Sequence, residues 1–66
     1  MKIYKVMDNV SNIKSYVKIS DNCNIFDTGY KALQITRKHY NDYNISGTQI
    51  LSDNEKMIND IPVFTI

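Results

Sequence analysis

The residues best suited to nucleophilic or metal chemistry are a single cysteine and a single histidine. Cys23 and His39 lie sixteen positions apart, and Asp27 lies between them. A nucleophile, a base and an orienting carboxylate must converge before they can catalyse a reaction, and nothing in this spacing brings the three together. An isolated Cys or His in a polar segment is far more often an ordinary surface group. We therefore expect no catalytic residues and no enzyme activity.

Metal and cofactor sites are not expected either. A closed structural zinc site normally needs four Cys or His ligands, and the chain has two such residues. The segment Asp53-Asn54-Glu55 is similar in composition to the start of a calcium loop, but it lacks the central glycine and the distal glutamate of such a loop. Gly29 and Gly47 stand alone, so no glycine-rich phosphate-binding loop is present.

The best candidate for a binding surface is a mixture of cations and aromatic rings in Tyr30-Lys31, Arg37–Tyr40 and Tyr43. Within it, the predicted binding residues are Arg37, Lys38, Tyr40 and Tyr43. Tyrosine and arginine anchor many protein–protein interfaces. Single-stranded nucleic-acid sites also combine rings for stacking with cations for phosphates. The commonest outcome for such tyrosines is packing in a small core without tryptophan. Protein binding comes next, and nucleic-acid binding comes last because the net charge is only +1.

The charges are unevenly distributed along the chain. Residues 1–40 hold seven Lys or Arg against three Asp, whereas residues 41–66 hold one Lys against four Asp or Glu. Such asymmetry can produce a dipolar surface that meets a partner. More often, the two halves of so small a chain fold together and their charges interleave.

Length and composition indicate a single small domain over residues 1–66, with a net stability of a few kcal/mol. One cysteine cannot form an internal disulfide, and this pattern fits a reducing compartment. The first residues, Met1–Lys5, lack the long apolar core of a signal peptide. No apolar run approaches the roughly 20 residues that span a bilayer. We expect a cytoplasmic protein without membrane contact.

Alternating apolar residues predict strands that could position the candidate binding residues. The predicted strands are Lys2–Met7, Tyr16–Ser20, Thr48–Leu51 and Ile61–Ile66. Lys2–Met7 has apolar residues on both faces, which indicates a strand covered on two sides or a strand with one face left for something outside this chain. Ile61–Ile66 is the densest apolar run, and we expect the rest of the chain to be organised around it. Pro62 cannot donate a ladder hydrogen bond, so this strand should lie at an edge or begin after the proline.

The remaining segments are expected to form turns and one ambiguous element. Ile25 and Phe26 should enter the core after the turn over residues 21–24, and Ser52–Lys56 should form a hairpin loop that leads to Met57-Ile58. Residues 29–40 fit either a helix capped by Thr28 or a strand, and we favour an extended or irregular stretch. The expected fold class is α+β or mainly β, with a small antiparallel sheet of three to five strands and at most one short helix. Its exposed edge strand could pair with a partner or with a second copy.

The order of four short motifs resembles the N-terminal region of the immunity-protein 11 family of bacterial polymorphic toxin systems. These motifs are Lys2–Val10, Tyr16–Ile19, Gln49–Asp53 and Asp60–Phe64. The family typically opens with a Tyr-Lys strand and an Asx-rich loop, and later carries an acidic turn and a Pro-Val-Phe segment. Family members are usually much longer, and their mid-region tryptophan is matched here at best by Tyr40 or Tyr43. The resemblance therefore implies a shortened member of a longer family.

The resemblance implies a small cytoplasmic binding protein that inhibits a cognate bacterial toxin by forming a complex with it. Two alternatives stay open. Size and a bias toward Asn, Ile, Lys and Tyr also fit a phage or mobile-element protein that inhibits a host enzyme. The cluster of Arg37, Lys38, Tyr40 and Tyr43 also fits a single-stranded nucleic-acid binding module.

Overall fold

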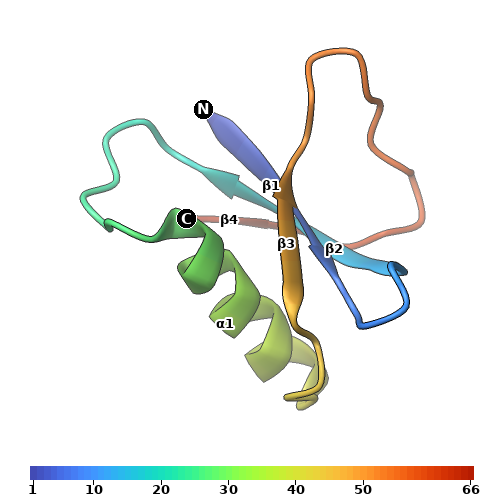
Figure 1. The fold of residues 1–66 in the computed structure, drawn as a ribbon. Coiled ribbons are helices and arrows are strands. Elements are labelled where there is room, and N and C mark those ends of the chain that lie inside the picture. The colour runs from blue at the N-terminus through green and yellow to red at the C-terminus, as the bar shows by residue number, and fades with distance from the viewer.

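The computed structural model describes residues 1–66 and has four strands and one helix. The elements are β1 (Lys2–Met7), β2 (Ile13–Ile19), α1 (Thr28–Tyr40), β3 (Gly47–Ile50) and β4 (Val63–Thr65). The strands form one sheet in the order β3-β1-β2-β4, and α1 lies against one face of it (Figure 1). This small α+β fold confirms the expected class. The sheet is mixed, because β4 runs parallel to β2 while the other pairs are antiparallel.

The antiparallel pair β1 and β2 forms the centre of the sheet. Asp8 makes the turn between them, because its Oδ1 accepts hydrogen bonds from the backbone N–H groups of Val10 and Asn12 at 2.9 and 3.0 Å. The prediction for β1 is confirmed, whereas β2 begins at Ile13, three residues earlier than expected. The expectation that Ile61–Ile66 is the organising segment is wrong, since β4 lies at an edge.

The main core lies between α1 and the helix-facing side of β1 and β2. Side chains two apart in a strand point to the same face. Tyr4 and Val6 of β1 accordingly share a face with Val17 and Ile19 of β2. The core cluster consists of Tyr4, Val6, Val17, Ile19, Ala32, Leu33 and Ile45. Ile45, in the loop between α1 and β3, is fully buried.

The segment of residues 51–62 covers part of the opposite face of the sheet. It leaves β3 beside β1, where Leu51 donates its N–H to the carbonyl of Ile3 at 2.8 Å, and it reaches β4 on the far side of β2. Crossing the sheet in this way makes β4 parallel to β2. The predicted hairpin is wrong, because β3 pairs with β1 and Met57-Ile58 forms no strand. The segment supplies the second cover expected for β1.

Residues 28–40 form a helix, so the preference for an extended stretch is wrong. Asp27, not Thr28, is the N-cap, and its Oδ1 accepts the N–H of Tyr30 at 2.8 Å. Asn41 ends the helix in the left-handed conformation, with φ of 52°. The buried positions of α1 are Gly29, Ala32, Leu33 and Thr36. They have helical spacing but only one large apolar side chain, so the apolar stripe is weak in the sequence.

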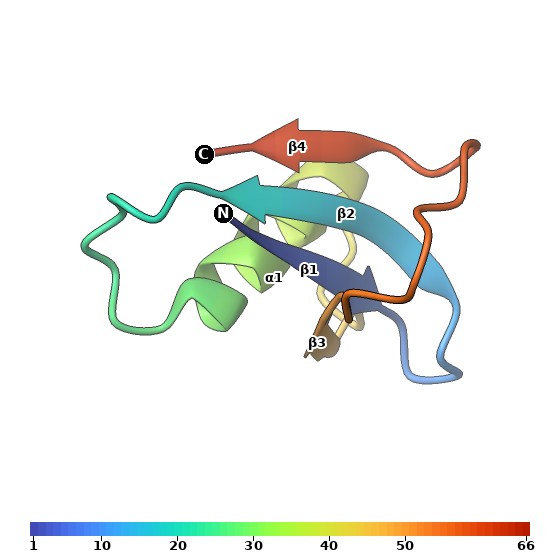
Figure 2. The same ribbon diagram turned by 90° about the horizontal axis from the view of Figure 1, so that it is seen from above.

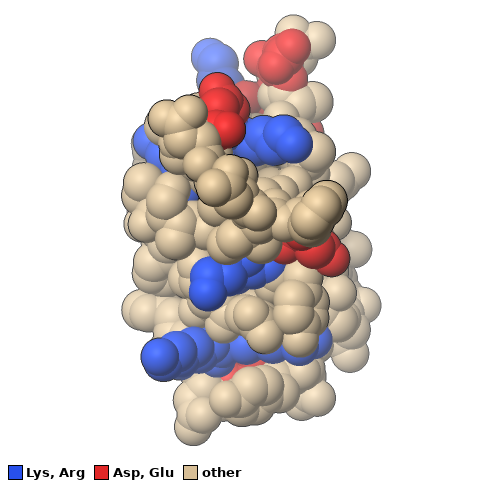
Figure 3. All heavy atoms as spheres, turned by 90° about the vertical axis from the view of Figure 1, so that its left-hand side faces the viewer, with Lys and Arg blue, Asp and Glu red and all other residues tan.

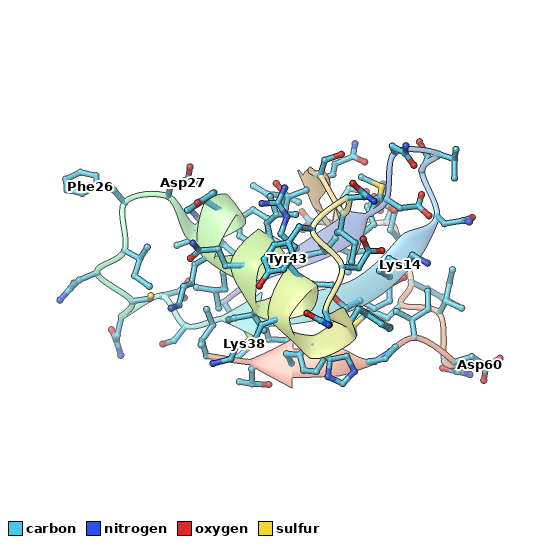
Figure 4. All side chains as sticks on the ribbon, turned by 90° about the horizontal axis from the view of Figure 1, so that it is seen from below. Lys14, Phe26, Asp27, Lys38, Tyr43 and Asp60 are labelled. Carbon is cyan, nitrogen blue, oxygen red and sulfur yellow. The ribbon has the colours of Figure 1, made fainter.

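Two further expectations concern Phe26 and the final strand. Phe26 does not enter the core: its side chain is fully exposed, Ile25 is also exposed, and Figure 4 shows Phe26 pointing away from the body of the molecule. Neither residue belongs to the core cluster, whereas Ile45 does. β4 begins one residue after Pro62 and lies at the edge of the sheet, as predicted (Figure 2).

Candidate binding site

The structure separates the three residues considered for catalysis. Asp27 caps the first turn of α1, and His39 lies in the last turn. Twelve residues of helix at 1.5 Å each place their backbones about 18 Å apart. Cys23 is half-buried and packs against the core. No group of three or more His, Cys, Asp or Glu side chains is placed to hold a metal ion.

An open groove of about 600 Å³ runs along the solvent side of α1. Its lining residues are Tyr30, Lys31, Gln34, Ile35, Arg37, Lys38 and Tyr43. Six of these belong to α1, while Tyr43 comes from the loop that follows the helix. In Figure 4, Tyr43 lies over α1 and Lys38 extends from the helix nearby. The groove is therefore formed by one helix and the chain that folds back along it.

Arg37 holds that loop against the helix. Its Nε donates a hydrogen bond to the carbonyl of Ile45 at 2.6 Å, and the buried Ile45 side chain anchors the same loop in the core. Asp42 stabilises the start of the loop, because its Oδ1 accepts the N–H of Asn44 at 3.0 Å. These contacts fix the backbone on both sides of Tyr43. Tyr43 consequently lies at the groove, with its side chain largely exposed.

The groove is positively charged. Lys31, Arg37 and Lys38 line it, and no acidic residue does. The ion pairs of the molecule join Met1 to Asp21, Lys5 to Glu55 and Lys14 to Asp8, so none involves a groove cation. Figure 3 shows Lys and Arg side chains crossing the side of the molecule that carries α1.

The acidic residues of the second half of the chain lie mostly away from the groove. Glu55 pairs with Lys5 on the opposite face of the sheet, and Asp60 lies at the far end of the molecule from the start of α1 (Figure 4). Lys5–Glu55 is the one ion pair that joins the two halves of the chain. The charges therefore interleave at this pair, while the cations of α1 stay unneutralised.

The four predicted binding residues have different positions. Lys38 and Tyr43 line the groove, and Arg37 lines it while also bonding to the loop. Tyr40 lies elsewhere, since its hydroxyl donates a hydrogen bond to the carbonyl of Lys14 at 2.7 Å. Its ring also meets His39 edge-on, with ring centroids 4.9 Å apart. The structure thus brings three of the four together at one groove.

Gln34 and Ile35 line the groove but were not part of the predicted cluster, whereas Tyr30 and Lys31 belonged to it without being singled out as binding residues. Tyr30, Gln34 and Lys38 are spaced at i, i+4 and i+8, which places them on one side of a helix. An extended stretch would have spread the same residues along its length. Assigning the segment as a helix would therefore have revealed the groove.

Comparison with protein-family models, curated proteins and solved structures finds no match for this chain. The resemblance to the immunity-protein 11 family stays a prediction. α1 is the sole helix, and it is neither long enough nor apolar enough to cross a membrane.

Proposed function

We propose that this protein is a cytoplasmic immunity-type inhibitor that binds an acidic surface of a cognate bacterial toxin through the α1 groove. The observation that carries this proposal is the groove itself, which is lined by three cations without acidic partners and by two exposed tyrosines. The resemblance of the four sequence motifs supports the choice of a toxin as the partner.

The groove suits an acidic protein surface for two physical reasons. Lys31 and Lys38 can meet carboxylates, and their field raises the rate at which an oppositely charged partner arrives. Tyr30 and Tyr43 offer large, rigid ring surfaces that lose little conformational entropy on binding. Inhibition then requires only that the bound protein cover the active site of the toxin.

The test uses a charge-reversed groove, Lys31→Glu with Lys38→Glu. The matched control is Lys2→Glu with Lys56→Glu, which makes the same change in net charge at two exposed lysines outside the groove. Tagged protein captures its partner from the native cells, and the captured protein is then expressed with each variant. We expect a toxic partner that is neutralised by the wild type and the control but not by the groove variant.

Two results would contradict the proposal. Equal capture and neutralisation by the groove variant would show that the partner binds elsewhere. A captured partner that is harmless to cells would exclude immunity, and capture of a host enzyme that the protein inhibits would favour the phage or mobile-element alternative.

Single-stranded nucleic acid is the second candidate ligand, because the same groove combines rings and cations. Titration with a labelled oligothymidine at low salt tests it. Tight binding that is lost in the Lys31→Glu, Lys38→Glu variant would favour a nucleic-acid function over inhibition of a toxin.

A further inference from the structure

The outer edge of β4 is open. β4 is the last strand of the sheet and pairs only with β2, and Figure 2 shows no segment beyond it. The chain meets β2 through Pro62 and Ile66: Tyr16 donates to the carbonyl of Pro62 at 2.9 Å, and Ile66 donates to the carbonyl of Lys18 at 2.9 Å. Because backbone groups alternate in direction along a strand, the N–H and C=O groups of Val63 and Thr65 face outward.

Shortness is the only usual protection that β4 has against strand pairing, since it has three residues. Natural edge strands are also commonly blunted by charged side chains, a bulge or a proline within the strand. Ile61–Ile66 contains no charged residue, and Pro62 lies just before β4. Val63 and Ile66 are 43% and 38% exposed, although both are apolar.

The helix also leaves room beside β4. α1 packs over β3, β1 and β2, and it makes no close backbone contact with β4. On that side of the sheet, the ring of Phe64 meets the ring of His39 with centroids 4.7 Å apart. A strand added next to β4 would therefore lie beside Phe64 and His39 on the helix side of the sheet.

We propose that two copies of this chain pair through β4, antiparallel and about a twofold axis at Phe64. In this register, Val63 of each copy faces Thr65 of the other, and both residues present outward N–H and C=O groups. All outward backbone groups of the two strands are then paired, which gives four hydrogen bonds. No other antiparallel register pairs all of them.

A second copy fits this edge because the segment is complementary to itself. Val63 and Thr65 form a β-branched cross-strand pair, and the two Phe64 rings face each other across a non-hydrogen-bonded position. No like charges meet along the strands, since Ile61–Ile66 has none. The pairing does not involve the α1 groove, so it is independent of the proposed function.

The interface is small because β4 has three residues. We expect a dissociation constant on the order of 100 µM, as for other interfaces at the small end of the range. Sedimentation equilibrium of the full chain, from roughly tenfold below to tenfold above that value, should show the average mass rising from 7.7 kDa toward twice that mass.

The variant that tests the edge is Val63→Lys, and its matched control is Val10→Lys in the exposed β1–β2 turn. We expect association at least about tenfold weaker for Val63→Lys, because a lysine on an edge strand opposes pairing. Val10→Lys should associate as the wild type does. Ile50→Lys reports on the β3 edge in the same way. A wild-type chain that stays monomeric, or association that is lost in Ile50→Lys and kept in Val63→Lys, overturns the proposal.

Amide hydrogen exchange of the wild type gives a second readout that needs no substitution. The proposal predicts that the amides of Val63 and Thr65 exchange more slowly as the concentration rises, while those of Thr48 and Ile50 do not change. Protection confined to Thr48 and Ile50, or to neither edge, contradicts pairing through β4. This measurement decides the matter if Val63→Lys fails to fold.

Discussion

Lys5 Nζ lies 2.6 Å from Glu55 Oε2 and joins the central strand β1 to the segment that crosses the open face of the sheet. The Lys5 side chain is only 11% exposed, so its charge requires a partner. The other Glu55 oxygen accepts hydrogen bonds from the N–H and hydroxyl of Ser52 at 3.1 and 2.8 Å. One carboxylate thus neutralises a buried lysine and fixes the start of the covering segment.

The first prediction concerns acid stability. Hydrogen bonds from Lys5 and Ser52 lower the pKa of Glu55 from 4.5 to about 2. Because this pKa is lower in the folded protein than in the unfolded chain, the interaction stabilises the fold above pH 4.5 and is lost as the pH falls toward 2. Glu55→Gln should therefore be less stable than wild type at pH 7, and the difference should shrink across this window.

Urea unfolding followed by circular dichroism at several pH values between 2 and 7 measures this difference. The pKa values of Asp8 and Asp21 are also lowered, so the comparison with wild type is needed to isolate Glu55. Asp53→Asn is the control, because this nearby carboxylate forms no ion pair. A constant gap between Glu55→Gln and wild type from pH 2 to 7 would show that the ion pair is not responsible.

The second prediction concerns the hydroxyl of Tyr16. This side chain is buried, and its oxygen accepts the N–H of Ile58 at 3.1 Å from the covering segment. Tyr16→Phe leaves that N–H without its acceptor and should lower the free energy of unfolding by about 1–2 kcal/mol. The exposed Tyr43 makes no such bond, so Tyr43→Phe should change stability by less than about 0.5 kcal/mol. Equal effects in urea titrations would exclude this role for Tyr16.

The third prediction concerns the buried hydroxyl pair of Ser15 and Thr36. Their oxygens lie 2.6 Å apart, and Thr36 Oγ1 also donates to the carbonyl of Ala32 at 3.0 Å. Thr36→Val leaves the buried Ser15 hydroxyl without its hydrogen-bond partner and should lower the free energy of unfolding by about 1–3 kcal/mol. The double variant Ser15→Ala, Thr36→Val should cost less than the two single changes together. Additive costs in a double-mutant cycle would show that the two hydroxyls do not interact.

The fourth prediction concerns the start of α1. Asp27→Ala removes the acceptor for the N–H of Tyr30 and should lower the free energy of unfolding by about 1 kcal/mol. Asp27→Asn keeps an acceptor at the same position and should retain most of the stability. Thermal unfolding of both variants gives the comparison. If the asparagine variant were as unstable as the alanine variant, the cap would not depend on this hydrogen bond.

The local pattern of residues was sufficient to predict some elements. Alternating apolar residues predicted β1 with its observed limits, because strand periodicity is a property of neighbouring residues. Pro62 predicted that the last strand lies at an edge or begins after the proline, because proline has no N–H to donate. Both alternatives hold for β4. The mixture of cations and rings between residues 30 and 43 indicated part of the groove, which is lined by Tyr30, Lys31, Arg37, Lys38 and Tyr43.

Tertiary packing decided the rest. α1 buries Gly29, Ala32 and Thr36 beside one leucine, and such small side chains become a helix face only when a sheet lies against them. Ile45 lies in the core because the loop after α1 folds back against the helix, where Arg37 donates a hydrogen bond to the Ile45 carbonyl. Phe26, in the loop before α1, stays exposed. β3 pairs with β1 rather than with a hairpin strand at Met57-Ile58. The segment after β3 is instead held against the sheet by the hydrogen bonds of Lys5 to Glu55 and of Tyr16 to Ile58. Each of these outcomes depends on contacts between residues far apart in the chain, which local periodicity does not encode.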